Sequence, residues 1–238
     1  MRRAGRLAAI AIGLLGVCLV VGALVEGDSM LGIEIGSAVL AATWIVLVAR
    51  ELHGMRRLEV LLSPDAREVP LHGVPCRVTP TLGADAVVLG SLRPRIYVGL
   101  DTVSELSEEE LRAVIHHEDH HRRTRAPLRA AALLAWLRIL GRSGLFRRHL
   151  LDRLADLETL ADADAIRRGS EPRSLARALL KSDAGLRPVA FAYAAERRVL
   201  RLLEQADGTP VQTGERLPYE WLPAIATSVA LLGCHVGL

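Results

Sequence analysis

The stretch SEEELRAVIHHEDHHRR, from Ser107 to Arg123, combines a helix start with a metal-binding pattern. Ser107, followed three residues later by Glu110, is the capping-box pattern that begins a helix. Apolar residues then recur at the spacing of one helix face. The stretch therefore predicts a helix that begins near Ser107 and runs through the histidines.

Within this helix, the residues from His117 to His121 match the pattern HExxH. Residues four apart lie on one face of a helix, so His117 and His121 can bind the same Zn²⁺ ion. Glu118 then lies beside the metal, where it can take a proton from a water molecule that the cation activates. We expect Glu118 to be the general base of a hydrolytic site.

A third ligand is expected from Glu158, on a later predicted helix. Two histidines and one carboxylate leave a fourth position open for water, as catalytic zinc sites require. Asp162 lies one turn after Glu158 and can accept the spare N–H of a ligating imidazole. The sequence thus predicts one catalytic zinc site.

His116 and His120 form a second pair with the same spacing, rotated by about 100° on the helix. We interpret them as polar or packing neighbours, because only His117 has a glutamate directly after it. The alternative is a metal-storage or metal-sensing protein that uses all four histidines. That alternative predicts more than one bound metal and no dependence on Glu118.

The composition favours a membrane protein. Of the 238 residues 50% are hydrophobic but only 3% are aromatic, and the mean hydropathy is +0.26. The three cysteines include no CxxC pair, which excludes a disulfide scaffold and a cysteine-type zinc finger.

Two apolar runs, 7–25 and 31–49, are each long enough to cross a bilayer. A cleaved signal peptide is the alternative for the first run. Arginines flank the pair on both outer sides and are missing from the connecting loop, so residues 50 onward are expected in the cytoplasm. Residues 222–238 are a marginal third span. We therefore divide the chain into a transmembrane hairpin (1–50), a cytoplasmic domain (51–221) and a C-terminal membrane segment (222–238).

The cytoplasmic domain is predicted to be α+β and mostly helical. Short β-rich runs separated by proline and glycine indicate a small antiparallel sheet. The expected strands are 76–79, 86–89 and 95–98. Further helices are expected over 128–140, 149–168, 174–180 and 194–204.

No acidic residue occurs between Asp119 and Asp152, although this part of the chain holds eight arginines. They are Arg122, Arg123, Arg125, Arg129, Arg138, Arg142, Arg147 and Arg148. A nucleic-acid groove would also need interleaved aromatic residues, and only Trp136 and Phe146 are present. We favour a core or membrane-surface helix whose arginines meet anionic headgroups, without direct nucleic-acid binding.

Taken together, the two N-terminal runs, the stretch LRPRIYVGLDTVSELSEEELRAVIHHEDHHRRTRAPLR and the later ETLAD resemble the BlaR/MecR-type integral-membrane zinc metallopeptidases. These are related to the HtpX and CAAX-prenyl-protease group of gluzincins. The similarity covers roughly residues 85–205, and Glu196–Leu203 (ERRVLRLL) is similar to a weaker downstream element. The resemblance implies a gluzincin-like fold with Zn²⁺ on His117, His121 and Glu158.

The resemblance also implies an activity: a multi-pass endopeptidase of the cell membrane, whose polypeptide substrate is a membrane protein or a transcriptional repressor in the cytoplasm. An extended substrate is expected to pair with the strand 86–89. A non-catalytic zinc-binding regulator or scaffold is the alternative, and a homo-oligomer or a separate sensor partner stays open. HtpX relatives carry a histidine before the downstream arginine element. This chain has none there, and Tyr193 is the nearest candidate to stabilise the oxyanion.

Overall fold

A computed structural model describes residues 29–142, 144–181 and 189–206, without the side chains of 29–33, 145 and 189–197. The chain divides into two compact units, one of Met1–Arg50 with Arg216–Leu238 and one of Glu51–Glu215. The predicted first span, 7–25, and the terminal run, 222–238, lie outside the described residues.

The first described element is the long helix α2, Ser29–Leu62. It contains the predicted second span, 31–49, and continues beyond it into the larger unit. Within the described ranges, its part Glu34–Leu62 is the one helix that is long and apolar enough to cross a bilayer, and none of its apolar window is buried.

The larger unit contains one four-stranded sheet, with the strands in the order β1-β2-β4-β3. The strands are β1 (Arg67–Leu71), β2 (Val74–Thr79), β3 (Ala86–Leu89) and β4 (Arg95–Gly99). β2 and β4 are parallel, while the other two pairs are antiparallel. The prediction of a wholly antiparallel sheet is therefore wrong. After β2, the chain passes through the 3₁₀ helix η1 (Pro80–Leu82) and forms the edge strand β3. The last strand, β4, then inserts between β2 and β3.

The sequence did not predict β1, the other edge strand. β1 and β2 form a hairpin whose two turn residues, His72 and Gly73, have φ angles of 49° and 78°. Two consecutive positive φ angles are typical of the type I′ turn, which suits the twist of a hairpin. Pro70 and Pro75 face each other across the pair and obscure its β pattern in the sequence.

The helix that carries HExxH is α4, Glu108–Arg123, and it begins as predicted. The Glu110 backbone N–H donates to the Ser107 hydroxyl at 3.3 Å, and the Ser107 backbone N–H donates to the Glu110 carboxylate at 2.9 Å. Both halves of the capping box are therefore formed, which fixes the first turn of the helix.

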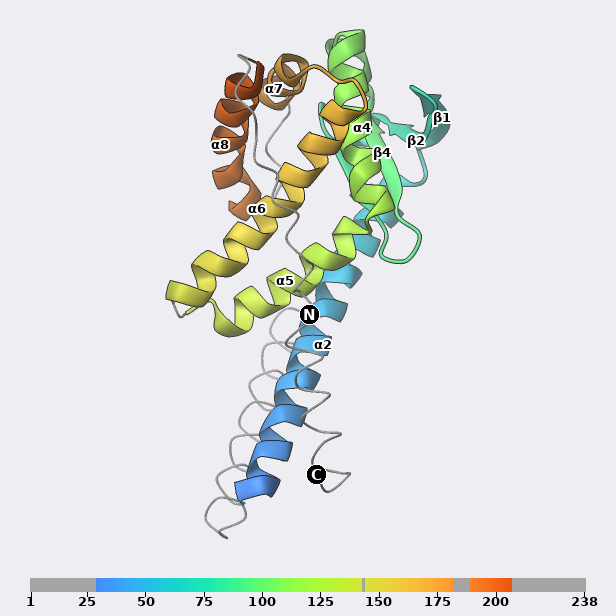
Figure 1. Cartoon of the computed structure of the whole chain (residues 1–238). Coiled ribbons are helices and arrows are strands. Elements are labelled where there is room, and N and C mark those ends of the chain that lie inside the picture. The colour runs from blue at the N-terminus through green and yellow to red at the C-terminus, as the bar shows by residue number, and fades with distance from the viewer. Residues whose placement is uncertain (1–28, 143, 182–188, 207–238) are drawn as a thin grey trace. The chain divides into compact units, whose positions relative to one another are not determined.

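Five more helices complete the described elements. They are α3 (Leu100–Glu105), α5 (Ala126–Leu140), α6 (Gly144–Arg167), α7 (Pro172–Lys181) and α8 (Val189–Ala206). All but α3 correspond to helical stretches predicted from the sequence, with shifted ends. Figure 1 shows α5 and α6 meeting at the end of this unit that is farthest from α7.

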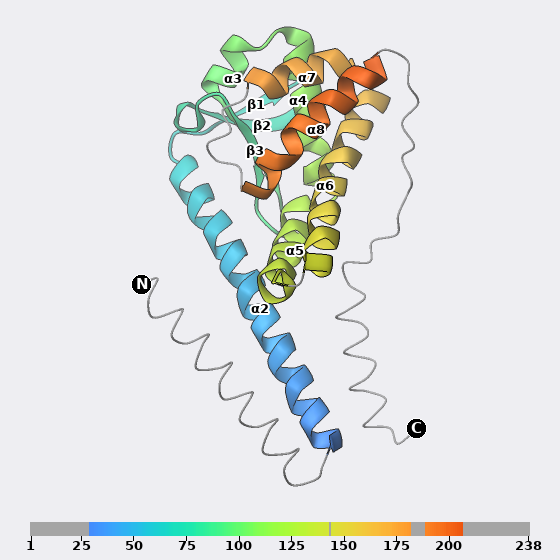
Figure 2. The ribbon, with the colours of Figure 1, turned by 90° about the vertical axis from the view of Figure 1, so that its left-hand side faces the viewer.

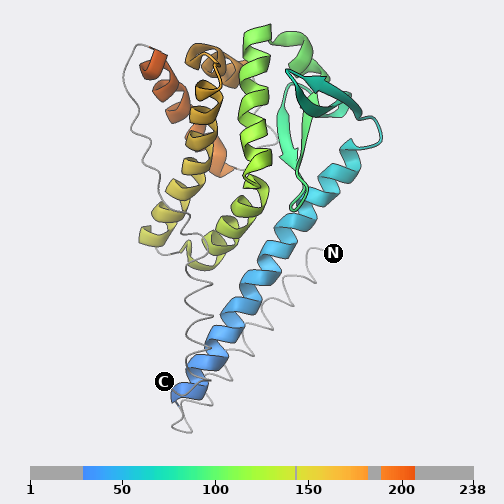
Figure 3. The same ribbon diagram turned by 45° about the vertical axis from the view of Figure 1, so that its right-hand side comes forward.

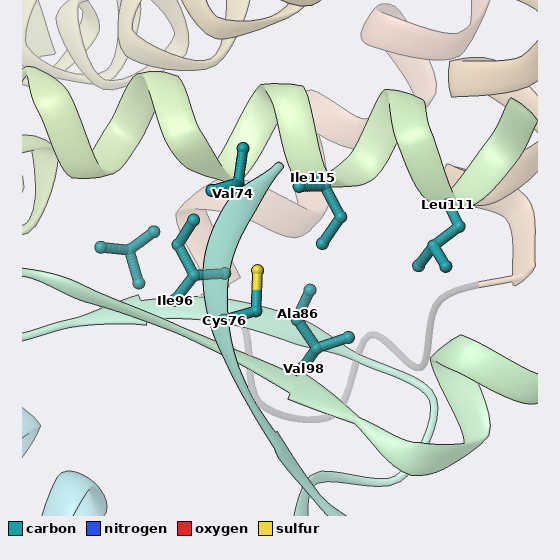
Figure 4. Packing of buried hydrophobic residues seen from close by; sticks show 8 residues of the cluster. Val74, Cys76, Ala86, Ile96, Val98, Leu111 and Ile115 are labelled. Carbon is teal, nitrogen blue, oxygen red and sulfur yellow. The ribbon is translucent and has the colours of Figure 1, made fainter. Parts of the chain in front are cut away.

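α4 lies between the sheet and the helices α6, α7 and α8 (Figure 3). On the sheet side, Leu111 and Ile115 of α4 pack on buried residues of the strands, as Figure 4 shows. On the helical side, Ala113 packs with residues of α6, α7 and α8, such as Leu175 and Leu202. The second face of the sheet is covered by the end of α2, through the cluster Leu62, Leu82, Leu89 and Tyr97. The central position of α4 leaves its histidines away from solvent.

We predict that Ser107→Ala lowers the free energy of unfolding by about 1 kcal/mol, the usual cost of losing a serine N-cap. The measurement is urea unfolding of the detergent-purified chain, followed by circular dichroism. Ser104→Ala is the matched control, because the Ser104 hydroxyl is exposed and makes only a local bond to Asp101. Equal stability of the two variants would contradict the assignment.

Candidate metal centre

Three ligand-type atoms converge between α4 and α6. The Nε2 atoms of His117 and His121 are 3.0 Å apart, and they lie 3.5 and 3.4 Å from the two carboxylate oxygens of Glu158. Ligands at about 2.0 to 2.1 Å from Zn²⁺ in a tetrahedron are about 3.3 Å from one another. The observed separations therefore fit a tetrahedral zinc site with one open position.

The two helices place these atoms through their spacing and packing. His117 and His121 are one turn apart on α4, and Glu158 comes from α6, which packs along α4. All three side chains are nearly buried, with 9% or less of each residue exposed. The sequence predicted this set of three, and the structure brings it together.

Asp162, one turn beyond Glu158, lies behind His117. Its carboxylate is 2.9 Å from the Nδ1 atom of His117. A carboxylate at this atom favours the tautomer with a proton on Nδ1, so the lone pair of Nε2 is directed to the ligand set. The structure places Asp162 where the sequence predicted a supporting carboxylate. His121 differs, because its buried Nδ1 has no hydrogen-bond partner among the described residues.

The sequence did not predict the role of Arg198, on α8. Its guanidinium is buried and donates to Glu158 at 2.5 Å and to Asp162 at 2.6 and 2.9 Å. The sequence offers two signals for it. Arg198 lies in the downstream element 196–203 named above, and it is four residues before Leu202, a core residue on the same helix face. A lone arginine on an apolar face indicates a buried acidic partner, but not which one.

The charges of this cluster are strongly coupled. Burial opposes ionisation of Glu158, but the nearby Arg198 guanidinium outweighs it and holds the pKa of Glu158 well below its usual value. Burial also raises the pKa of Asp162, but Arg198 and the hydrogen bond with His117 outweigh it, so this pKa is lowered as well. Burial also disfavours the charged form of His117, yet the hydrogen bonds with Asp162 and Glu158 raise its pKa to about 9.

The charges of the cluster suit a metal cation. The Arg198 guanidinium compensates one of the two buried carboxylates, Glu158 and Asp162, and a proton on His117 compensates the other. Buried charges are costly unless they are paired or bind a metal. A cation on the three ligands would take the place of that proton, so the donor set fits Zn²⁺ in chemistry as well as in geometry.

Glu118 lies beside the ligands and is not engaged. It is 6% exposed and makes no hydrogen bond to another described residue. It faces a cavity together with His117 and Arg198. The other described lining residues are Ala84, Asp85, Ala86, Thr102, Glu105, Leu106, Val114, Leu175, Ala178, Leu179 and Lys181. A free carboxylate in this place can exchange a proton with a molecule in the cavity.

The remaining residues of the motif have other partners. The ring of His116 is hydrogen-bonded to Ser170 at 3.0 Å, and His120 is 3.4 Å from Asp164. Asp119 is buried and accepts bonds from Arg122, Arg123 and Arg168. Among the described residues, therefore, a single group of possible metal ligands is present.

Tyr193 lies on α8, but its side chain is outside the described residues. The prediction that it stabilises the oxyanion is therefore not tested.

Comparison with known proteins gives this chain no relatives: no protein-family model, curated protein or solved structure matches it. The resemblance to the BlaR/MecR-type metallopeptidases stays a prediction.

We predict one zinc ion per chain, held through Glu158. Glu158→Ala should lose zinc during dialysis, because it removes a ligand. Asp162→Ala should bind zinc about 10- to 100-fold more weakly, the usual effect of losing a residue that orients a ligand. Elemental analysis of detergent-purified protein measures both.

Asp156→Ala is the control, because Asp156 lies on the same helix, is half exposed and pairs with Arg153. It should retain zinc like the parent. If Asp162→Ala is metal-free while Glu158→Ala retains zinc, the two roles must be exchanged. Two or more tightly bound ions would favour the histidine-cluster alternative.

We also predict that Arg198→Met destabilises the zinc-free protein by about 3 to 5 kcal/mol, because two buried carboxylates lose their partner. Urea unfolding in the presence of a chelator measures the change. Arg201→Met, one turn later on α8, is the control, since exposed Arg201 bonds only to the Thr159 hydroxyl within the described part of the chain. Equal effects of the two substitutions would argue against a stabilising role for Arg198.

Proposed function

We propose that this protein is a membrane-anchored zinc endopeptidase that hydrolyses peptide bonds of a cytoplasmic or membrane protein. One observation carries the proposal: two histidines and a glutamate converge at zinc-ligand spacing, with the unengaged carboxylate of Glu118 beside them. A structural zinc site is usually closed by a fourth protein ligand and has no use for a free base.

Zinc in such a site acts as a Lewis acid, which activates water and polarises the carbonyl group of the peptide bond. Glu118 takes a proton from the attacking water and then donates it to the nitrogen of the leaving amine. Asp162 keeps the His117 ring in one orientation through the contact at Nδ1. Arg198 fixes both carboxylates of α6, so the ligand Glu158 keeps its position.

The surroundings of Glu118 suit an extended polypeptide substrate. The cavity is lined by Ala86 of β3 and by apolar residues of α7 such as Leu175 and Ala178. Among the described residues, β3 is an edge strand that pairs only with β4. A substrate strand can pair with the free edge of β3, so that the backbone provides affinity and the cavity receives a side chain.

The proposed location is the cell membrane, with the catalytic domain in the cytoplasm. The apolar part of α2 provides the anchor that the described residues support. The further spans at 7–25 and 222–238, and so a multi-pass topology, rest on the sequence alone. By its resemblance to the BlaR/MecR-type group, a transcriptional repressor is a candidate substrate.

We predict that Glu118→Gln retains zinc and lowers peptide hydrolysis by about 10²- to 10⁴-fold, because the amide cannot accept the proton. The assay follows cleavage of fluorescein-labelled casein by the full chain in lipid nanodiscs, with zinc content measured on the same samples. Glu109→Gln is the control, because Glu109 is exposed on the same helix.

Casein cleavage at the parent rate by Glu118→Gln would exclude this residue as the base. A parent protein with one zinc ion that cleaves neither casein nor cellular proteins would favour the non-catalytic regulator.

A further inference from the structure

At the junction of α5 and α6, the described residues 138–142 and 144–149 form a basic tip. Arg142, Phe146, Arg147 and Arg148 are exposed there, and Phe146 keeps 49% of its surface accessible. Figure 2 shows α5 and the start of α6 side by side at this end of the unit. The tip lies far from the metal centre along α6, so the proposed hydrolysis does not use it.

The arginines of the tip differ from the others on these helices. Arg122, Arg123 and Arg168 share the buried carboxylate of Asp119. For Arg142, Arg147 and Arg148, in contrast, the described part of the chain provides no ion pair. No acidic residue occurs between Asp119 and Asp152, and Glu51, which lies near the tip, is paired with Arg138. The positive charge is therefore open to an external anion.

The helix dipole strengthens this charge. Arg147 lies in the first turn of α6, which contains no acidic residue, and Arg148 follows directly after it. The N-terminal end of a helix carries partial positive charge, so arginines there are unfavourable unless an anion compensates them. Guanidinium groups bind phosphate oxygens through two parallel bonds, and an exposed phenylalanine among them suits the boundary between headgroups and acyl chains.

An ion pair within the larger unit joins the start of the tip to Glu51. Arg138, at the end of α5, pairs with this residue, which belongs to the part of α2 in the same unit. In the sequence, Glu51 comes directly after Arg50 and the apolar run 31–49. If that run spans a bilayer, as proposed above, Glu51 lies at the bilayer boundary. The ion pair then holds the start of the tip at the same level.

We propose that the α5–α6 tip docks on the anionic surface of the bilayer that holds the chain, with the three arginines on lipid phosphates and Phe146 among the headgroups. The position of the tip at the bilayer boundary rests on the proposed α2 anchor. The charge and the exposure of the tip do not depend on that anchor. Docking would hold the catalytic domain at a fixed distance from the membrane.

The experiment places a nitroxide label at Gly144→Cys in the full chain in lipid nanodiscs. A Cβ atom at Gly144 meets no other atom within 4 Å, so the label is tolerated. Cys18 and Cys234 are replaced by alanine, while buried Cys76 is kept. Immersion is measured as the ratio of two collision rates of the label, one with oxygen and one with a water-soluble nickel chelate. Discs of phosphatidylcholine alone are compared with discs that also contain phosphatidylglycerol.

We expect the label at residue 144 to be immersed in the anionic discs and to lose immersion in the neutral discs or at high salt. Arg147→Gln with Arg148→Gln should abolish the immersion. Arg67→Gln with Arg93→Gln is the matched control, because it removes the same charge at two exposed sites of the sheet region. This control should leave the immersion unchanged.

Lack of immersion in the anionic discs overturns the proposal, as does immersion that depends on neither lipid charge nor Arg147 and Arg148. RNA binding is measured on the same variant. If Arg147→Gln with Arg148→Gln weakens RNA binding and leaves immersion unchanged, the arginines bind nucleic acid and the docking proposal is overturned. A label at Val46→Cys separates the two proposals, because it reports on the α2 anchor. If the label at residue 46 stays outside the bilayer while the label at residue 144 is immersed, the proposed α2 anchor is wrong and the docking of the tip is supported.

Discussion

Arg198 joins three helices at one buried point. Its guanidinium comes from α8, bonds to Glu158 and Asp162 of α6, and lies next to His117 of α4. Each of these charges would be costly in the core without the others. A relative shift of any one helix would leave a buried charge unpaired, so this cluster holds the helices in a narrow range of positions. The ligand atoms of the candidate metal centre depend on that constraint.

α4 is buried because each of its faces finds suitable partners. Leu111 and Ile115 pack on the sheet, which gives the helix a large apolar contact. The polar residues lie on the other faces, where partners from α6 and from the segment after it are available, as Asp119 and Arg168 illustrate. Glu118 has no such partner among the described residues and faces the cavity. A buried polar group without a partner calls for an explanation, and the proposed role in proton transfer would supply one.

The two ends of α6 provide different environments for charge. Toward its C-terminal half, carboxylates and arginines are paired within the protein, so the charges are internal and fixed. At its N-terminal end, arginines are exposed and unpaired within the described chain. If the proposed docking is correct, the same helix carries the metal ligand and the membrane contact. The distance of the metal centre from the bilayer would then follow from the length of α6, and it would limit which part of a membrane protein can reach the site.

The sequence by itself determined the features that depend on neighbours in the chain. The capping box at Ser107, the strand 86–89 and the histidine pair on one helix face all follow from local geometry, and Glu158 was identified from its place on a later helix. Tertiary structure decided the rest. The parallel pairing of β2 with β4 depends on where a distant strand inserts, and the type I′ turn at His72 and Gly73 is formed by the hairpin that it closes. The downstream element 196–203 pointed to this part of α8, but the partners of Arg198 became known only from the packing of α8 against α6. A buried charge is defined by the partners that surround it, and the order of residues along the chain does not specify those partners.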